Sequence, residues 1–220
     1  MCMRFAFTPL NVNDVMGRYD LESIDHELKP RYNISPSQKV PVVYNDSPKM
    51  LSTAVWGIPT HWKGVDEKLL LNARGETIDQ KPSFKKDFQL NRCLMLADSF
   101  YEWKKPEKRP FRISLKKGMF AFAAIYSKGK DGERSCCMIT TGTNELVSQI
   151  HDRMPAILPL KREKDWLSLA PEEAKTLIKP FPAGEMEMVE ISRKINSSKI
   201  DNPGVVEPKS SKESLLEYMG

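Results

Sequence analysis

Apolar residues in the middle of the chain gather in short runs rich in β-branched and aromatic side chains. Clusters of Gly, Pro, Lys and Asp separate the runs, and this pattern is typical of β-strands joined by turns. The predicted strands cover 40–44, 51–56, 93–97, 111–115, 119–126 and 136–141. Two connections predict hairpins: 116–118 joins the fourth strand to the fifth, and 127–134 joins the fifth to the sixth.

The predicted helices are short and cover 12–18, 83–90, 144–150 and 171–178. The last begins with Pro171 and carries two glutamates in its first turn, where negative charge favours a helix. The end of the chain is polar and lysine-rich, with a marginal helix over 211–218. We therefore expect an α+β fold. A single compact domain, 1–202, would surround a curved, barrel-like, mostly antiparallel sheet with short flanking helices, and 203–220 would form a polar tail.

Composition narrows the class of protein. With 220 residues and 40% apolar content, the chain can bury one sizeable core. It has no apolar run long enough for a membrane span and no long apolar stretch of a signal peptide, so we expect a cytoplasmic protein. Four cysteines without Cys-x-x-Cys spacing and three histidines argue against a disulfide framework or a zinc site. We expect no metal and no cofactor.

The net charge of +5 is only weak evidence for a polyanionic partner. Arg4, Arg74 and Arg153 are more informative because they lie beside aromatic or reactive groups. Arginine and aromatic side chains together are typical of surfaces that bind single-stranded nucleic acid, although each arginine alone is more often an ordinary surface charge. The segment Trp56-Gly57-Ile58-Pro59 could present a rigid aromatic wedge to bases, or it could cap the core.

Cys2 follows the initiator Met1, so removal of one residue would create an N-terminal 1,2-aminothiol. Its amine and thiol have ordinary pKa values of about 8 and 8.5, so both are partly nucleophilic near neutral pH. An aldehyde suits this pair, because the amine forms an imine that the thiol closes into a thiazolidine. The same thiolate could instead serve a peptidase or amidohydrolase. On this dipeptide alone, a cysteine present by chance is the simpler interpretation.

Three other residues are candidates for chemistry. Glu102 lies between two large aromatics, and desolvation there would raise its pKa and suit acid/base catalysis, unless it is a buried structural carboxylate. His151 could shuttle protons near neutral pH, although a lone histidine is more often structural. Asn72 stands two residues before Arg74, and together they could anchor a sugar-phosphate group.

Taken in order, these motifs resemble the SRAP family, named for SOS-response-associated peptidases, over nearly the whole chain. The motifs are Cys2 behind Met1, Arg31-Tyr32-Asn33-Ile34-Ser35-Pro36, Trp56-Gly57-Ile58-Pro59, Asn72-Ala73-Arg74 with Glu76-Thr77, Ala97-Asp98, Phe100-Tyr101-Glu102-Trp103, Thr140-Thr141 with Asn144, His151-Asp152-Arg153-Met154-Pro155, and Asn196-Ser197. The resemblance implies a compact α+β fold and an abasic-site processing protein. Such a protein loses its first methionine and links the new N-terminal cysteine to the ring-opened aldehyde of an abasic site in single-stranded DNA.

The resemblance implies a role for each matching residue. Cys2 would be the nucleophile, and Asn72 would position the amino terminus or the sugar. Glu102 would be the acid/base in ring opening and imine formation, and His151 a second proton donor that also assists reversal of the link. Arginines would bind phosphates, and aromatics would shape the floor and wedge under a bent strand. The implied DNA contacts are Arg4, Trp56, Pro59, Arg74, Trp103, Thr141 and Arg153.

The resemblance also implies a wider setting. The protein would act as a monomer in the DNA damage response, with lyase and autopeptidase-type activity, on the nucleoid when bound to DNA and with the replication machinery as a partner. Two positions depart from the family pattern: Met3 replaces a usual Gly, and Gly75 replaces a usual Ser. Two other functions stay open. One is a cysteine peptidase or amidohydrolase that uses Cys2 and His151, and the other is a non-covalent reader of damaged DNA.

Overall fold

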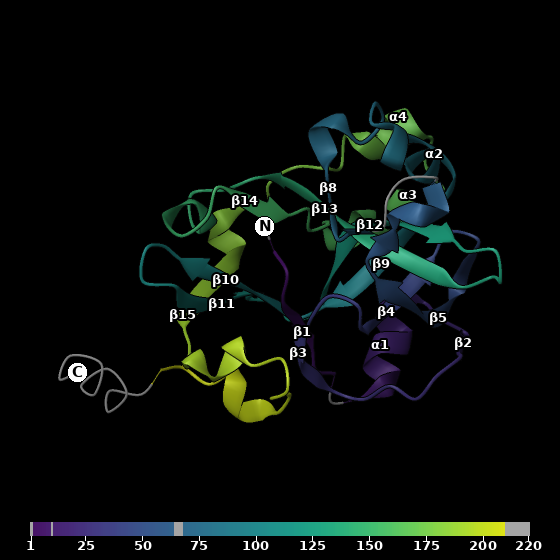
Figure 1. Ribbon diagram of the computed structural model, residues 1–220. Helices are drawn as coiled ribbons and strands as arrows, with labels where there is room; N and C mark the ends of the chain where they lie inside the picture. Colours follow the sequence, from purple (N-terminus) through teal and green to yellow (C-terminus); the bar gives the residue numbers. More distant parts are fainter. Residues whose placement is uncertain (1, 10, 64–67, 210–220) are drawn as a thin grey trace.

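Two sheets form most of the computed structural model, which describes residues 2–9, 11–63 and 68–209 (Figure 1). Neighbouring strands of the first sheet are antiparallel throughout. In spatial order its strands are β15 (Met186–Glu190), β11 (Arg109–Leu115), β10 (Ser99–Lys104), β1 (Phe5–Phe7) and β3 (Arg31–Ile34). The first strand in sequence therefore occupies an interior position in the sheet.

The second sheet is larger and mostly antiparallel. In spatial order its strands are β14 (Arg153–Pro155), β13 (Arg134–Gly142), β12 (Phe120–Lys128), β9 (Arg92–Ala97), β4 (Lys39–Tyr44), β5 (Ser47–Trp56) and β2 (Ser23–Ile24), with β8 (Asn72–Arg74) paired to β13. A parallel pairing also joins β13 to β5, so the sheet curves back on itself. Two short strands, β6 (Ile58–Pro59) and β7 (Leu69–Leu70), pair separately.

Aromatic side chains fill the space between the two sheets. The ring of Phe5 on β1 packs edge-on against Trp56 on β5 and Phe122 on β12, with ring centroids 5.4 and 5.7 Å apart. Phe100 on β10 also reaches Phe122. These four side chains are fully buried, so β1 connects the cores of both sheets.

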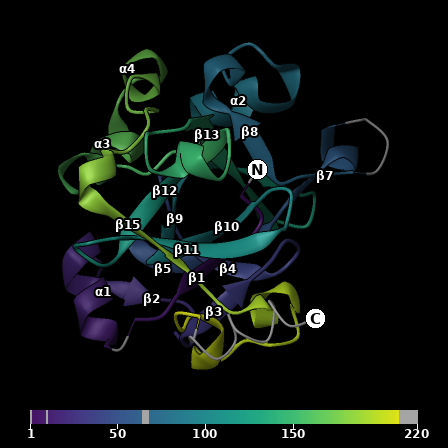
Figure 2. The same ribbon diagram turned by 90° about the vertical axis from the view of Figure 1, so that its left-hand side faces the viewer.

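In the described residues, four short α-helices lie outside the sheets: α1 (Val12–Tyr19), α2 (Pro82–Leu90), α3 (Glu163–Ser168) and α4 (Pro171–Lys175). In both views α1 lies at the opposite end of the molecule from α2 and α4 (Figures 1 and 2). Asn11 begins α1 by accepting a hydrogen bond from Asn13 N–H, and Pro82 and Pro171 open α2 and α4 at positions that need no N–H donor. In the part of the chain that the structure describes, no helix is both long and apolar enough to cross a bilayer.

The predicted fold class is confirmed, as a single α+β domain with mostly antiparallel strands and few helices. All six predicted strands are present, as β4, β5, β9, β11, β12 and β13. The hairpin over 127–134 is confirmed by pairing of β12 with β13. The hairpin over 116–118 is wrong, because β11 and β12 belong to different sheets and this turn carries the chain between them.

Three of the predicted helices are present, and the fourth is wrong. Over 144–150 only a 3-10 turn forms, Val147–Gln149, because Asn144 turns its side chain to the backbone of Val147 and Phe181 instead of extending a helix. At the end of the described chain, Val205 is fully buried and Pro208 bridges to Ile191. Residues 203–209 therefore pack on the domain, whereas the helix predicted over 211–218 lies outside the described residues.

Close packing accounts for a glycine at position 75. A β-carbon at this position would stand 2.3 Å from Cγ2 of Ile178, which follows α4. Such a distance is far inside van der Waals contact, so the serine expected from the resemblance does not fit beside Ile178. The segment that carries Arg74 is thus pressed against the α4 region.

We predict that Gly75→Ser lowers the free energy of unfolding by about 1–3 kcal/mol, the usual cost of overpacking. Adding Ile178→Ala should recover part of that loss, because it removes the clashing methyl group. Denaturant unfolding of both single variants and the double variant measures the coupling. Gly142→Ser is the control, since a β-carbon there meets nothing within 4 Å. Additive effects of the first two changes would contradict the steric explanation.

Candidate active site around Cys2

Cys2 precedes β1 and is held where the two sheets meet. Its side chain is 1% exposed, and Sγ donates to the carbonyl oxygen of Arg4 at 3.5 Å. Strand β1 pairs with both β10 and β3, and Tyr101 N–H donates to the carbonyl of Arg4. In both views the N-terminus lies between β10 and β8 (Figures 1 and 2). Backbone pairing therefore fixes Cys2 relative to β10, which carries Glu102.

Asn72 reaches Cys2 from the second sheet. Its Nδ2 donates to the carbonyl oxygen of Cys2 at 3.1 Å, while its buried Oδ1 has no hydrogen-bond partner among the described residues. Strand β8 is held by parallel pairing with β13, in which Asn72 stands opposite Met138. The amide thus anchors the backbone of Cys2 and leaves a buried acceptor beside it.

Glu102 is the second group beside Cys2. Its side chain lies on β10, the residue is 4% exposed, and Oε1 has no hydrogen-bond partner within the described chain. Burial raises the pKa of Glu102 to about 7. Burial and the nearby charge of Glu102 also raise the pKa of the Cys2 thiol well above its ordinary value. At neutral pH the thiol keeps its proton, and Glu102 exchanges between its protonated and ionised forms.

His151 completes the group, with Nε2 3.9 Å from Oε2 of Glu102. On the other side of the ring, Nδ1 accepts a hydrogen bond from the backbone N–H of Arg153 at 3.0 Å and also lies 3.0 Å from the exposed Asp152 carboxylate. The backbone donor is fixed, so we assign the neutral tautomer with its proton on Nε2, facing Glu102. Burial lowers the pKa of His151, which favours this neutral form.

The three predicted phosphate-binding arginines have different surroundings. Arg153 forms a bidentate ion pair with Glu76, at 2.6 and 2.9 Å, and donates to the carbonyl of Thr140. Arg4 donates to Asn33 Oδ1 at 2.6 Å and to the carbonyl of Ile195. Arg74 is exposed at the end of β8. Only Arg74 stands open to solvent, whereas the other two already hold protein partners.

The other residues predicted to contact DNA differ in how exposed they are. Trp56 is not at the surface: it is 0% exposed, packs in the core and donates from Nε1 to the carbonyl of Leu71. A large ring is needed there because β1 and β5 leave space between the sheets. Pro59 on β6 is half-buried, and Thr141 is buried where β13 pairs with β14. Trp103 is half-buried and donates from Nε1 to Asn196 Oδ1 at 2.8 Å.

Two further residues support the site. Asn33 is fully buried, accepts from Arg4 and donates to carbonyls in the 195–200 segment. Glu76 holds Arg153. Both stand inside the sequence motifs that carry the family resemblance, but neither had a role assigned from sequence. A buried asparagine and an exposed glutamate give no chemical signal until their partners are known.

A buried thiol, a carboxyl of raised pKa and a neutral histidine define a cysteine-centred site in an α+β domain. The profile of the SOS response associated peptidase (SRAP) family matches residues 1–198, and the chain belongs to this family. The abasic site processing protein YoqW of Bacillus subtilis is 38% identical, over 94% of this chain and 99% of that protein. The abasic site processing protein YedK of Escherichia coli is 28% identical, over 94% of this chain and 100% of its own length. A crystal structure of a Bacteroides thetaiotaomicron protein, 27% identical, covers 95% of this chain and 100% of its own, with a TM-score of 0.81.

We predict that burial of Glu102 makes stability pH-dependent. Its carboxyl has a pKa of about 7 in the fold against 4.5 ordinarily, so the native state retains a proton that the unfolded chain releases. The native state therefore loses stability as pH rises from 4.5 to 7. Relative to wild type, Glu102→Gln should gain stability across this window, reaching on the order of 1–3 kcal/mol above pH 7.

Denaturant unfolding of wild type and Glu102→Gln between pH 4 and 8 measures this difference in stability. Taking the difference cancels the contributions of the other titrating groups. Glu107→Gln is the matched control for the exchange of a carboxyl for an amide, because Glu107 is exposed. A constant difference between wild type and Glu102→Gln over the window would show that Glu102 is not protonated in the fold.

Proposed function

We propose that this protein processes abasic sites in single-stranded DNA by linking Cys2 to the ring-opened sugar. The observation that carries the proposal is the burial of Cys2 beside Glu102, with Asn72 fixing its backbone carbonyl. The names of YoqW and YedK, which describe abasic site processing, support the same substrate. Removal of Met1 would free the amine next to the thiol at this point of the fold.

The protonation states support an order for the chemistry. The amine attacks the sugar aldehyde first and forms a carbinolamine, which loses water to give an imine. The sulfur of Cys2 then adds to the imine carbon, and the thiol proton passes to the nitrogen. The products are a thiazolidine and one water molecule. A protonated thiol suits this sequence, because the second step is an intramolecular closure that needs no standing thiolate.

Glu102 and His151 would divide the proton transfers. A carboxyl with a pKa of about 7 can donate a proton to the ring oxygen of the sugar during ring opening and recover one from the anomeric hydroxyl. It can then protonate the carbinolamine hydroxyl, which leaves as water. The neutral His151 ring directs its Nε2 proton at Glu102, 3.9 Å away in the free protein. It can return a proton to that carboxylate once it has taken up a second proton, as an imidazolium. Catalytic hydrogen bonds are often long before substrate binds.

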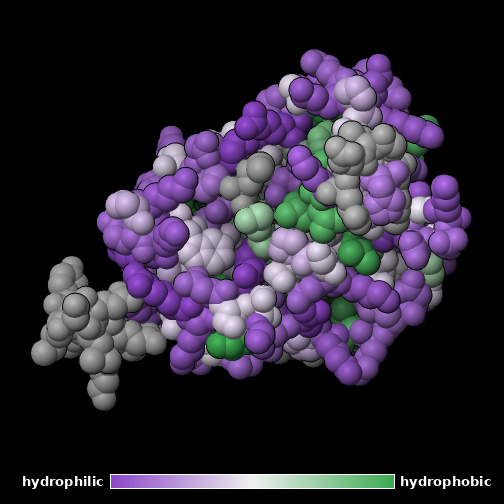
Figure 3. Space-filling view, in the orientation of Figure 1, coloured by the Kyte–Doolittle hydropathy of each residue, from purple (hydrophilic) through white to green (hydrophobic). Residues whose placement is uncertain are grey.

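DNA binding would use the face that carries the N-terminus. This face is mostly hydrophilic, with apolar residues near its centre (Figure 3). Arg74, at the end of β8, is exposed and would meet a phosphate. The half-buried Trp103 ring follows Glu102 on β10 and packs against the cluster that holds Tyr101 and Ile195. Arg153 would have to exchange the Glu76 carboxylate for a phosphate, which binds a guanidinium in the same bidentate way.

A peptidase that uses a Cys2–His151 pair finds less support. Such enzymes activate sulfur as a thiolate next to an imidazolium, whereas here the pKa of Cys2 is raised and the pKa of His151 is lowered. Within the described residues, the hydrogen bond of Cys2 Sγ goes to the Arg4 carbonyl. Loss of Met1 is the one peptide cleavage that the proposal requires.

The purified protein should lack Met1 by intact mass and should form a denaturant-stable adduct with an oligonucleotide that carries one abasic site. Cys2→Ala should abolish the adduct but keep most of the affinity for the strand. Cys93→Ala is the matched control, since Cys93 is also a buried free thiol and should leave the adduct unchanged. Adduct formation by Cys2→Ala would rule out the aminothiol mechanism, and tight binding without any adduct in wild type would indicate a non-covalent reader.

Glu102→Gln should slow adduct formation by about 10²–10⁴-fold, the usual contribution of a positioned acid/base group, with little change in DNA affinity. His151→Ala should slow formation less and chiefly change the rate at which the completed link reverses. Single-turnover rates of both directions, measured at several pH values, separate the two roles. Wild-type rates in Glu102→Gln would make Glu102 a structural residue.

A further inference from the structure

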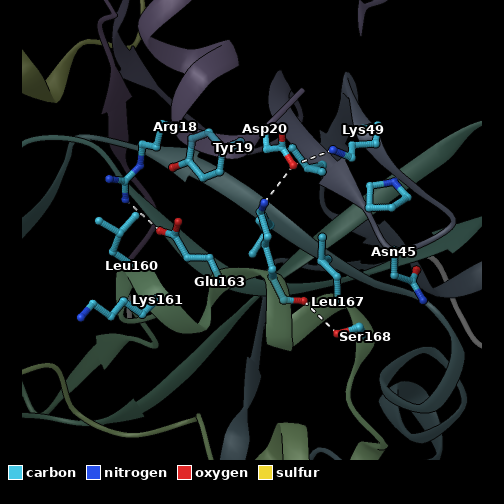
Figure 4. A pocket seen from close by; sticks show the side chains of 14 residues that line it. Arg18, Tyr19, Asp20, Asn45, Lys49, Leu160, Lys161, Glu163, Leu167 and Ser168 are labelled. Carbon is cyan, nitrogen blue, oxygen red and sulfur yellow. Dashed lines mark hydrogen bonds and ion pairs between the residues drawn. The ribbon is translucent and has the colours of Figure 1, made fainter. Parts of the chain in front are cut away.

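The protein also has a cavity whose lining residues do not include Cys2. Its volume is about 520 Å³, and it opens between α1 and α3 over strands β4 and β9 (Figure 4). Val43, Leu94 and Leu167 supply apolar walls. None of the residues that line this cavity belongs to the candidate active site. Its size and largely apolar lining are those of small-molecule sites.

Ion pairs hold the two sides of this cavity together. Arg18 on α1 pairs with the buried Glu163 on α3 at 2.9 Å. Asp20, just after α1, accepts from Lys164 on α3 at 3.0 Å and from Lys49 on β5 at 2.6 Å. The walls are therefore fixed by contacts between elements that are distant in the sequence, and the cavity is a built feature rather than a gap between mobile loops.

Unpaired buried polar atoms gather at this cavity. Three of its lining residues carry one among the described side chains: Arg18 Nε, Tyr19 Oη and Asn45 Oδ1. Another three such atoms belong to Asn72, Glu102 and Arg153 of the candidate active site. Buried polar groups normally have partners, and unpaired ones often mark a ligand site or another functional role. The cavity between α1 and α3 shares this property with the candidate active site.

The lining of the cavity carries an excess of positive charge. Arg18 pairs with Glu163, Lys49 and Lys164 share Asp20, and Arg18 Nε still lacks an acceptor among the described residues. Burial raises the pKa of Glu163 to about 7, so it carries only part of its negative charge at neutral pH. Four basic side chains line the cavity against two acidic ones. A ligand that satisfies Arg18 Nε must bring an acceptor.

We propose that this cavity binds a small organic anion with an apolar body, such as an aliphatic carboxylate. The apolar body packs on Val43, Leu94 and Leu167, and the carboxylate lies at the end formed by Arg18 and Tyr19. Asn45 Oδ1 lies across the cavity from Arg18 and can accept from a hydroxyl or amino group at the far end of the ligand (Figure 4). This site does not depend on the proposed DNA function.

Octanoate, octylammonium and octan-1-ol share one apolar body and differ in charge, so they test the proposal directly. Octanoate should shift the methyl NMR signals of Leu94 and Leu167, and the other two probes should bind at least about tenfold more weakly. Tyr19→Phe removes only the hydroxyl whose proton is the assigned donor to the carboxylate, so it should weaken octanoate binding about tenfold. Tyr32→Phe is the matched control, because Tyr32 lies on β3 outside the cavity.

Equal affinity for the three probes would show an apolar hollow without selection for an anion and would overturn the proposal. No octanoate shift at Leu94 or Leu167 would overturn it as well. An unchanged octanoate affinity in Tyr19→Phe would show that the Tyr19 hydroxyl does not bind the carboxylate, and would overturn the proposed placement of the ligand. Adduct formation with abasic DNA should be the same in wild type and Tyr19→Phe, so this test and that of the proposed function fail separately.

Discussion

The pairing of β1 between β3 and β10 is the constraint on which the site depends. A chain terminus is usually the most mobile part of a domain unless a strand ties it into a sheet. Here three residues of strand follow closely on Cys2, and Phe5 anchors them in the aromatic core of both sheets. Within the proposed function, the Cys2 nucleophile would need a fixed position relative to its proton donor. Strand β10 provides that position, since it pairs with β1 and carries Glu102 on the same segment.

Burial of the candidate active site determines the protonation states of its titratable side chains. Desolvation disfavours the ionised forms of Cys2, Glu102 and His151 together, and their pKa values shift in the directions that keep all three neutral. A site of this kind is poor at making a standing thiolate and suited to passing protons one at a time. The Asn72 hydrogen bond adds position without adding charge. The electrostatics therefore favour condensation with an aldehyde over thiolate attack on a peptide.

The sequence predicted the strands of the larger sheet well, because their apolar runs are long and bounded by clear turn residues. In the smaller sheet it predicted only β11 and missed β1, β3, β10 and β15, which take their stability from neighbouring strands rather than from their own apolar pattern. The false hairpin at 116–118 has a related cause: a tight Gly-containing turn can equally carry a chain between two sheets, and only long-range pairing decides. Glu102 and His151 were identified by chemistry, but their proximity across the chain could not be derived from spacing. For Trp56 the sequence left both a surface wedge and a core position open, because a strand-ending tryptophan carries no signal for which side it faces, and its ring lies in the core.

The Arg153–Glu76 pair bears on how strongly such a site can hold DNA. In the free protein the carboxylate already supplies the bidentate partner that a phosphate would supply, and Thr140 fixes the guanidinium from behind. Phosphate binding at Arg153 would therefore be an exchange of anions, whose net free energy is much smaller than that of a new ion pair. Glu76 would also remain nearby as a repelling charge. An exposed Arg74 faces no such exchange, so within the proposed function it would supply more of the affinity, while Arg153 would contribute mainly to the placement of the strand over Cys2.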